Sequence, residues 1–128
     1  MFTKIAHDGN FLRVRRAKKA VKFIVVHYTA NNGDTARNNL DYYARSKVLS
    51  SAHYYVDDTE ICCSVPWEDV AYHCGRSDGK YVHASYRNAN SIGVEMCSRK
   101  KADVYYFTAE KGVQLPVHLA QKRYQGGT

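Results

Sequence analysis

The stretch that decides the fold is Phe23-Ile-Val-Val-His-Tyr28, in which apolar, mostly β-branched residues surround one histidine. This composition is typical of a buried strand. A second stretch, Ser91-Ile-Gly-Val-Glu-Met-Cys97, alternates between apolar and other residues as a strand does. His27 in the first stretch and Glu95 in the second are the side chains that ionise at or below neutral pH. These two side chains are therefore the first candidates for chemistry.

Further elements follow from the residues between and beyond these two strands. After Asn31-Asn-Gly-Asp34 the spacing of apolar residues predicts a helix near 35–46, with Asp34 as its N-cap. Residues 52–56 and 61–65 predict two strands joined by a tight turn. A last helix is expected over 108–124. The order predicts an α/β fold, with a central mixed β-sheet of strands 23–28, 52–56, 61–65 and 91–97 flanked by helices.

Length and composition limit the class of protein. The chain has 128 residues, of which 45% are hydrophobic and 24% charged, as in one compact globular domain. A core of this size is stable without disulfides or a structural metal, so a bound metal would indicate chemistry. The net charge of +7 favours polyanionic partners. Charge alone does not choose among nucleic acid, anionic lipid and an acidic bacterial wall.

Cysteine spacing and hydropathy exclude several other classes. None of the four cysteines forms a C-x-x-C pair, which excludes a zinc ribbon and a thioredoxin-like motif. The sequence leaves two alternatives open for the cysteines: all four are free thiols, or two of them form a disulfide. We expect no membrane span, because no apolar run approaches the ~18 residues that a span needs, and no signal peptide, because the first residues lack its apolar run and small-residue cleavage site. We therefore expect it to be cytoplasmic as made.

His27 and Glu95 each allow two interpretations. His27 is either a hydrogen-bonded core histidine or a metal ligand or general base. Glu95 is either a solvated carboxylate or a partly desolvated general base, and Gly93 on its face of the strand would leave room for a substrate.

Five motifs in order resemble one family, the zinc-dependent type 2 N-acetylmuramoyl-L-alanine amidases, which include phage lysins and peptidoglycan recognition proteins. The motifs are Val25-Val-His-Tyr-Thr-Ala30, Ser51-Ala-His-Tyr-Tyr-Val-Asp-Asp58, Val65-Pro66, Ala71-Tyr-His-Cys-Gly75 and Asn90-Ser-Ile-Gly-Val-Glu95. The resemblance implies a bacteriolytic, endolysin-like hydrolase that cleaves the amide between N-acetylmuramic acid and L-alanine in peptidoglycan.

The resemblance also implies roles for individual residues. His27 matches a zinc ligand, and Glu95 matches the carboxylate that activates water. His73, Asn90, Tyr28 and Thr29 lie in motifs that border the cleft and are implied substrate-binding residues. His53 also lies in a family motif, where a structural role is favoured.

The C-terminal sequence departs from the family pattern. The family continues beyond the last helix to a second zinc histidine and a cysteine or aspartate next to proline, whereas this sequence reads Gln125-Gly-Gly-Thr128. We therefore expect residues 1–128 to be a single amidase domain, C-terminally truncated relative to the family. Because a catalytic zinc needs about three protein ligands, either the site is degenerate or other residues, with His73 and Cys74 as candidates, complete it.

Three functions follow from these observations. The first is a zinc-dependent amidase that acts at the bacterial cell wall, like a phage lysin or after export by another route. The second is an inactive muramyl-peptide-binding domain that has lost its zinc site. The third, a nucleic-acid module, rests on charge alone, so no specific nucleic acid is expected. The expected partners are peptidoglycan and anionic cell wall polymers, with the protein a monomer.

Overall fold

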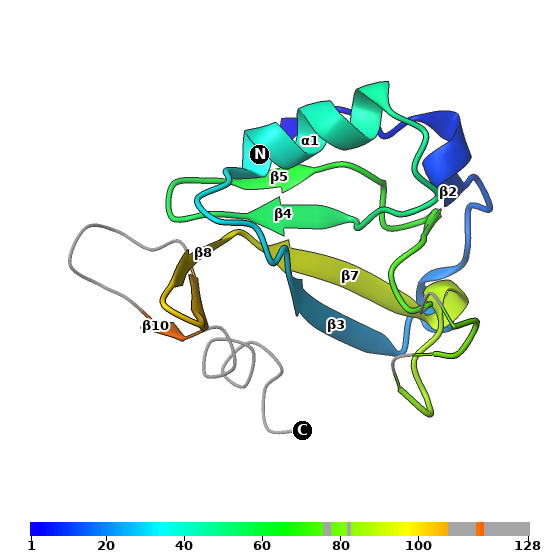
Figure 1. Cartoon of the computed structure of the whole chain (residues 1–128). Coiled ribbons are helices and arrows are strands. Elements are labelled where there is room, and N and C mark those ends of the chain that lie inside the picture. Colours follow the sequence, from blue (N-terminus) through cyan, green and yellow to red (C-terminus); the bar gives the residue numbers. More distant parts are fainter. Residues whose placement is uncertain (76–77, 82, 108–114, 117–128) are drawn as a thin grey trace.

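The computed structural model describes residues 1–75, 78–81, 83–107 and 115–116. A five-stranded mixed sheet forms its centre, in the order β1-β5-β4-β7-β3 (Figure 1). Its strands are β1 (Phe2–Thr3), β3 (Phe23–Tyr28), β4 (Tyr54–Val56), β5 (Ile61–Cys63) and β7 (Ser91–Met96). β7 pairs in parallel with both β3 and β4, whereas β4 and β5 form an antiparallel hairpin.

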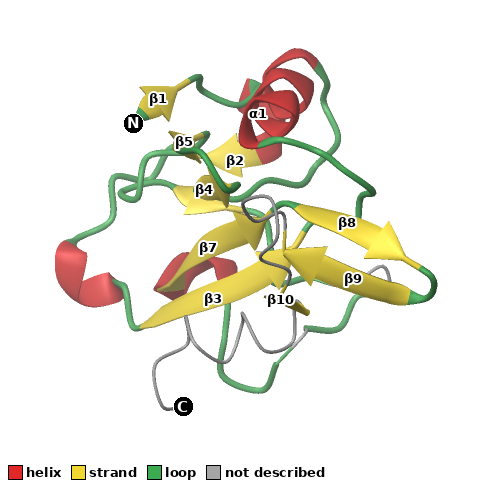
Figure 2. Cartoon of the chain, turned by 90° about the vertical axis from the view of Figure 1, so that its left-hand side faces the viewer, coloured by secondary structure: helices red, strands yellow, loops and turns green. Residues whose placement is uncertain are grey.

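Two smaller sheets extend this centre. β2 (Phe11–Leu12) pairs with β6 (Val70–Ala71) in an antiparallel arrangement. A three-stranded antiparallel sheet contains β8 (Ser98–Lys101), β9 (Val104–Phe107) and β10 (Leu115–Pro116). β8 and β9 run side by side beyond the end of β7 (Figure 2). Short 3-10 helices cover Asp8–Asn10, Lys18–Ala20 and Asn88–Asn90.

Helix α1 (Ala36–Arg45) covers one face of the sheet over β4 and β5 (Figure 1). Its buried side packs into a core whose members are Ala36, Leu40, Ala52, Tyr55, Cys62 and Cys97. Thr35 is the N-cap, since its hydroxyl accepts a hydrogen bond from the backbone N–H of Asn38 at 3.0 Å. The prediction of Asp34 as the N-cap is wrong. Its carboxylate instead accepts hydrogen bonds from the side-chain amide of Asn31 in the neighbouring loop and from the backbone N–H of Ser98 in β8.

Buried Asn10 fixes the opposite end of α1. Its side-chain amide donates hydrogen bonds to the backbone oxygens of Tyr43 and Ser46, at 2.9 and 2.8 Å. Its side-chain oxygen accepts hydrogen bonds from the backbone N–H groups of Val48 and Leu49, at 2.7 and 3.0 Å. One side chain therefore satisfies carbonyls that a helix leaves unpaired at its C-terminus and also holds the loop that follows.

Most of the predicted elements are confirmed. The α/β class and the mixed sheet are present, with strands shorter than predicted in the hairpin, and α1 matches the helix predicted near 35–46. The helix predicted over 108–124 is wrong at Leu115–Pro116, which form a strand paired with β9. Its other residues from 108 onward lie outside the described part of the chain. All four cysteines are buried free thiols.

Candidate active site

His27 and Glu95 lie side by side on two neighbouring parallel strands. β3 and β7 pair in register, and His27 is the direct partner of Glu95. Neighbouring strands are about 4.8 Å apart, and side chains paired in register point to the same face of a sheet. The structure therefore brings together the two residues that the sequence singled out, although 67 positions separate them along the chain.

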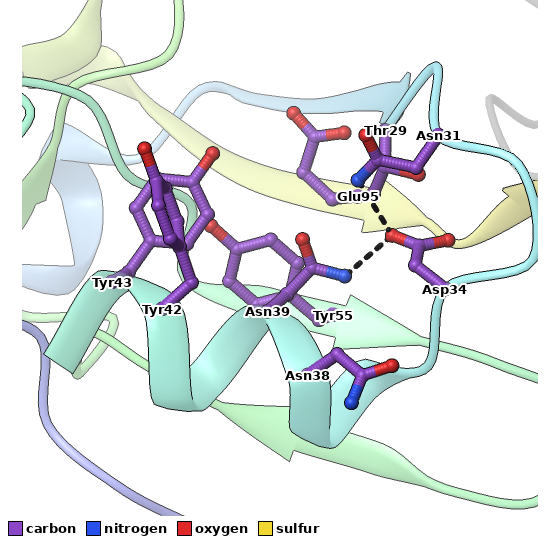
Figure 3. Close-up of a pocket in the computed structure, with 9 residues that line it drawn as sticks. All are labelled: Thr29, Asn31, Asp34, Asn38, Asn39, Tyr42, Tyr43, Tyr55 and Glu95. Carbon is purple, nitrogen blue, oxygen red and sulfur yellow. Dashed lines mark hydrogen bonds between the residues drawn. The ribbon is translucent and has the colours of Figure 1, made fainter. Parts of the chain in front are cut away.

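Glu95 lines a cavity of about 360 Å³ between α1 and the sheet. Figure 3 shows the Glu95 side chain rising from β7, above the turns of α1 in this view. The other lining residues are Thr29, Asn31, Asp34, Asn38, Asn39, Tyr42, Tyr43 and Tyr55. Amide, hydroxyl and aromatic groups therefore surround the carboxylate.

The environment of Glu95 favours its protonated form. Its Oε2 is buried and has no hydrogen-bond partner within the described residues. Burial, and secondly the negative charge of Asp34, raises the pKa of Glu95 to about 8. A carboxylate with a pKa near the working pH is suited to general acid and base catalysis. Asp34 itself is held by hydrogen bonds from Asn39 and Asn31, at 2.6 and 3.0 Å (Figure 3).

Glu95 also lines a second cavity, of about 600 Å³. Tyr43 and Tyr55 are common to the two cavities, and their rings stack with centroids 5.4 Å apart. The remaining lining residues come from the segment after α1, from the loop after β6 and from the 3-10 helix before β7, and they are Val48, Leu49, Ser50, Ser51, Tyr72, His73, Gly75 and Asn88. Glu95 therefore lines two cavities that share Tyr43 and Tyr55 as common lining residues.

Three imidazoles form a row beside this carboxylate. The ring centroids of His27 and His73 are 5.2 Å apart and those of His73 and His53 are 6.0 Å apart, both in edge-to-face arrangements. Burial lowers the pKa of His27. Burial lowers the pKa of His73 to about 3 and that of His53 to about 4, and the positive charge of nearby Arg16 acts in the same direction on both. All three rings are therefore neutral at neutral pH.

His53 has a structural position. It is fully buried, and its Nδ1 accepts a hydrogen bond from the backbone N–H of Gly93 at 3.0 Å. Its Nε2 lies 2.8 Å from the backbone oxygen of Asp69, to which it donates. Both ring nitrogens are engaged with the backbone, which agrees with the structural role favoured from the sequence.

The loop that carries His73 is held by Asn88. The side-chain oxygen of Asn88 accepts hydrogen bonds from the backbone N–H groups of His73 and Cys74, at 3.0 and 2.9 Å. Arg16, almost fully buried, donates to the backbone oxygen of Asn88 at 3.1 Å and to that of Ser91 at 2.8 Å. An arginine from the basic N-terminal segment therefore ties this loop to the start of β7.

The remaining predicted site residues occupy three different places. Thr29 lines the first cavity with Glu95. Tyr28 lies on the opposite face of the sheet from His27, because side chains alternate along β3, and its ring is 5.3 Å from that of Tyr105. Asn90 uses its side chain locally, since its oxygen accepts from the backbone N–H of Arg87 at 2.8 Å. The structure therefore does not bring Tyr28 or the Asn90 amide to the His27–Glu95 pair.

Sequence reasoning missed the residues that line the cavities from α1 and the residue that holds the His73 loop. Tyr42 and Tyr43 gave a signal, since two consecutive tyrosines on a short helix cannot both face the core. Asn88 gave none, because its function is to bind backbone groups 14 and 15 positions away.

The described residues do not form a complete metal site. Within them, no group of three or more His, Cys, Asp or Glu side chains is placed to hold an ion. His27 fits the role of a single ligand. His73 and Cys74 do not complete the set among the described residues, and the nitrogens of His73 lie 3.0 Å from His27 Nε2 and 3.1 Å from Ser91 Oγ.

Comparison with known proteins identifies the family. The sequence matches the family model described as N-acetylmuramoyl-L-alanine amidase over residues 17–125. It is 39% identical over 114 residues to N-acetylmuramoyl-L-alanine amidase BlyA of Bacillus subtilis (strain 168), covering 81% of this chain and 31% of BlyA. It is 38% identical over 128 residues to amidase CwlL of Bacillus licheniformis, covering 90% of this chain and 35% of CwlL. The chain belongs to the N-acetylmuramoyl-L-alanine amidase family.

Solved structures agree with this assignment. The catalytic domain of XlyA superposes with a TM-score of 0.60 at 28% identity, covering 75% of this chain and 60% of that chain. PlyL superposes with a TM-score of 0.59 at 29% identity, covering 76% of this chain and 57% of that chain. The chain spans about a third of the length of BlyA and CwlL. Where the chain is described, no helix is long and apolar enough to cross a membrane.

Proposed function

We propose that this chain hydrolyses the amide that joins the lactyl group of N-acetylmuramic acid to L-alanine of the peptidoglycan stem peptide. The observation that carries the proposal is the position of Glu95. Its Oε2 has no hydrogen-bond partner among the described residues, its pKa is about 8, and it lies beside His27 and lines two cavities. Membership of the amidase family supports this reaction in particular.

The two cavities suit a substrate that is bulky on both sides of the scissile bond. A muramyl peptide carries a sugar on one side of this amide and a peptide on the other. If the amide lies at Glu95, each cavity receives one of these groups. The Glu95 carboxylate then takes a proton from the attacking water and returns it to the leaving amine of L-alanine.

The family resemblance implies a zinc ion, and we assign His27 as one of its ligands. A bound zinc ion supplies a Lewis acid that polarises the carbonyl and lowers the pKa of water. A catalytic zinc has about three protein ligands, and the described residues provide only His27 with this fit. The incomplete set of zinc ligands among the described residues favours a second candidate function, a domain that binds muramyl peptide without cleaving it.

One experiment separates the two functions. The purified chain is incubated with insoluble peptidoglycan and Zn²⁺, and new N-terminal L-alanine and new reducing sugars are both quantified. The amidase proposal expects L-alanine without reducing sugars, and loss of this release in Glu95→Gln and His27→Gln. Binding of a muramyl peptide with no release of L-alanine would refute the amidase and support the binding domain. Asp8→Asn is the matched control, because Asp8 is an exposed carboxylate whose partner, Arg13, is also exposed.

A further inference from the structure

A line of hydrogen bonds runs from His27 to the backbone near the start of β7. His27 Nε2 lies 3.0 Å from His73 Nδ1, and His73 Nε2 lies 3.1 Å from Ser91 Oγ. Ser91 Oγ in turn lies 2.7 Å from the backbone oxygen of Arg87. Ser91 is fully buried, so its hydroxyl does not exchange these partners for bulk water. The direction of every bond in this line can be worked out by counting protons.

The backbone oxygen of Arg87 determines which atom the Ser91 hydroxyl donates to. A backbone carbonyl oxygen only accepts hydrogen bonds, and a serine hydroxyl has a single proton. Ser91 therefore donates that proton to the oxygen of Arg87. The bond between Ser91 and His73 must then be donated by His73, from Nε2–H to Ser91 Oγ.

The direction of the bond from His73 to Ser91 determines which nitrogen carries the proton in His73 and in His27. A neutral imidazole carries one N–H, so His73 with its proton on Nε2 has a lone pair on Nδ1. His27 Nε2 lies 3.0 Å from that lone pair and must donate to it. The proton of neutral His27 is thus on Nε2, and its Nδ1 keeps the lone pair. Within the described residues this Nδ1 has no hydrogen-bond partner.

We propose that Ser91 and His73 are positioning residues that hold His27 in its Nε2–H tautomer and leave Nδ1 as the one lone pair that His27 offers to the site. A ligand histidine normally donates its second N–H to a fixed acceptor, which sets its tautomer and its orientation. The inference rests on the proposed function only where it assigns this lone pair to an electrophile such as Zn²⁺. It also gives His73 a role other than the direct substrate contact expected from the sequence.

The packing around His73 keeps this ring in place. A methyl group at Gly93 would lie 2.7 Å from Cγ of His73, so the ring lies directly on the backbone of β7. Asn88 fixes the backbone of His73 from the other side, at 3.0 Å. The ring of His73 is therefore packed against β7, and its backbone is held by Asn88.

Nitrogen NMR of the metal-free chain at pH 8 tests the proposal. At this pH imidazoles with ordinary pKa values of about 6.5 are neutral. The ring signals are assigned with His27→Gln and His73→Gln, and His53 serves as an internal reference for a ring with its proton on Nε2. We expect a ¹⁵N–¹⁵N coupling across the hydrogen bond between His27 and His73, with the proton on Nε2 of His27. A proton on Nδ1 of His73, or no coupling, would overturn the inference.

A serine substitution tests the far end of the line. Ser91→Ala removes the acceptor of His73, so we expect loss of the coupling or transfer of the shared proton to Nδ1 of His73. Ser98→Ala is the matched control, because Ser98 is also fully buried and donates its hydroxyl to the Asn31 backbone oxygen, apart from the imidazoles. An unchanged coupling in Ser91→Ala would overturn the role of Ser91.

The outcome for the tautomer is separate from the outcome for the activity. The wild-type coupling alone decides the tautomer, even if Ser91→Ala does not fold. Because this measurement uses metal-free protein, an intact coupling together with absence of peptidoglycan hydrolysis would refute the proposed function and leave the positioning role of His73 standing.

Discussion

Gly93→Ala should displace the His73 ring and destabilise the protein. The added methyl carbon would lie 2.7, 2.8 and 2.9 Å from Cγ, Nδ1 and Cδ2 of that ring, which is closer than real contacts allow. The ring is bonded to His27 on one side and to Ser91 on the other, at 3.0 and 3.1 Å. Overpacking costs about 1–3 kcal/mol, and each lost hydrogen bond about 1 kcal/mol. We therefore expect a decrease of about 2–4 kcal/mol in the free energy of unfolding.

Urea denaturation of three proteins measures this effect. The control is Gly75→Ala, because no heavy atom of the described residues lies within 4 Å of the position that its methyl group would take, and its φ is not in the left-handed region. We expect Gly75→Ala to stay within about 0.5 kcal/mol of the wild type. If both variants were as stable as the wild type, the ring would have room to move, and the packing of His73 on β7 would not be the constraint described above.

Four further predictions concern charge, capping, thiols and the cell wall. In metal-free protein, the pKa of about 8 for Glu95 means that stability falls as pH rises from about 4.5 to 8. Glu95→Gln should abolish this fall, which is on the order of 5 kcal/mol, in denaturation curves across pH; an equal slope in both proteins would contradict it. Asn10→Ala should lose about 3 kcal/mol, because the four hydrogen bonds of this buried side chain disappear; thermal unfolding tests this, and a loss below 1 kcal/mol would refute it. The four buried cysteines should resist iodoacetamide in the folded protein and all react in urea, as mass spectrometry would show. With a net charge of +7, binding to purified walls should weaken as salt rises and the Debye length falls to about 8 Å; sedimentation that does not depend on salt would exclude an electrostatic contribution.

The sequence predicted the elements whose signal is local. β3 was predictable because it is a short apolar, β-branched run, β7 because its apolar residues alternate with others, and α1 because its apolar residues recur at helical spacing. His27 and Glu95 stood out as the side chains on these two strands that ionise at or below neutral pH. The parallel register that makes them neighbours is a tertiary feature. No local pattern specifies it.

The incorrect predictions have physical causes. Asp34 has the residue type of an N-cap, but adjacent Thr35 takes that role and forms a capping box with Asn38. Asp34 is thereby free to accept the backbone N–H of Ser98 at 3.0 Å and join the first loop to β8. At Leu115–Pro116, pairing with β9 prevailed over the helical spacing. Proline disfavours a helix interior and is tolerated at a sheet edge, which agrees with this outcome.

The polar side chains around the site are oriented mainly by backbone atoms, and this explains why a motif can locate such a site without revealing its chemistry. His53 binds two backbone groups, and Asn88 binds two more. The line from His27 ends on the carbonyl of Arg87. Residue type and spacing show that a histidine is present, but the proton on its ring is determined by a carbonyl whose position only the folded chain defines. The tautomer of His27 is therefore a property of the fold, and a substitution at buried Ser91, which does not touch His27, should change it.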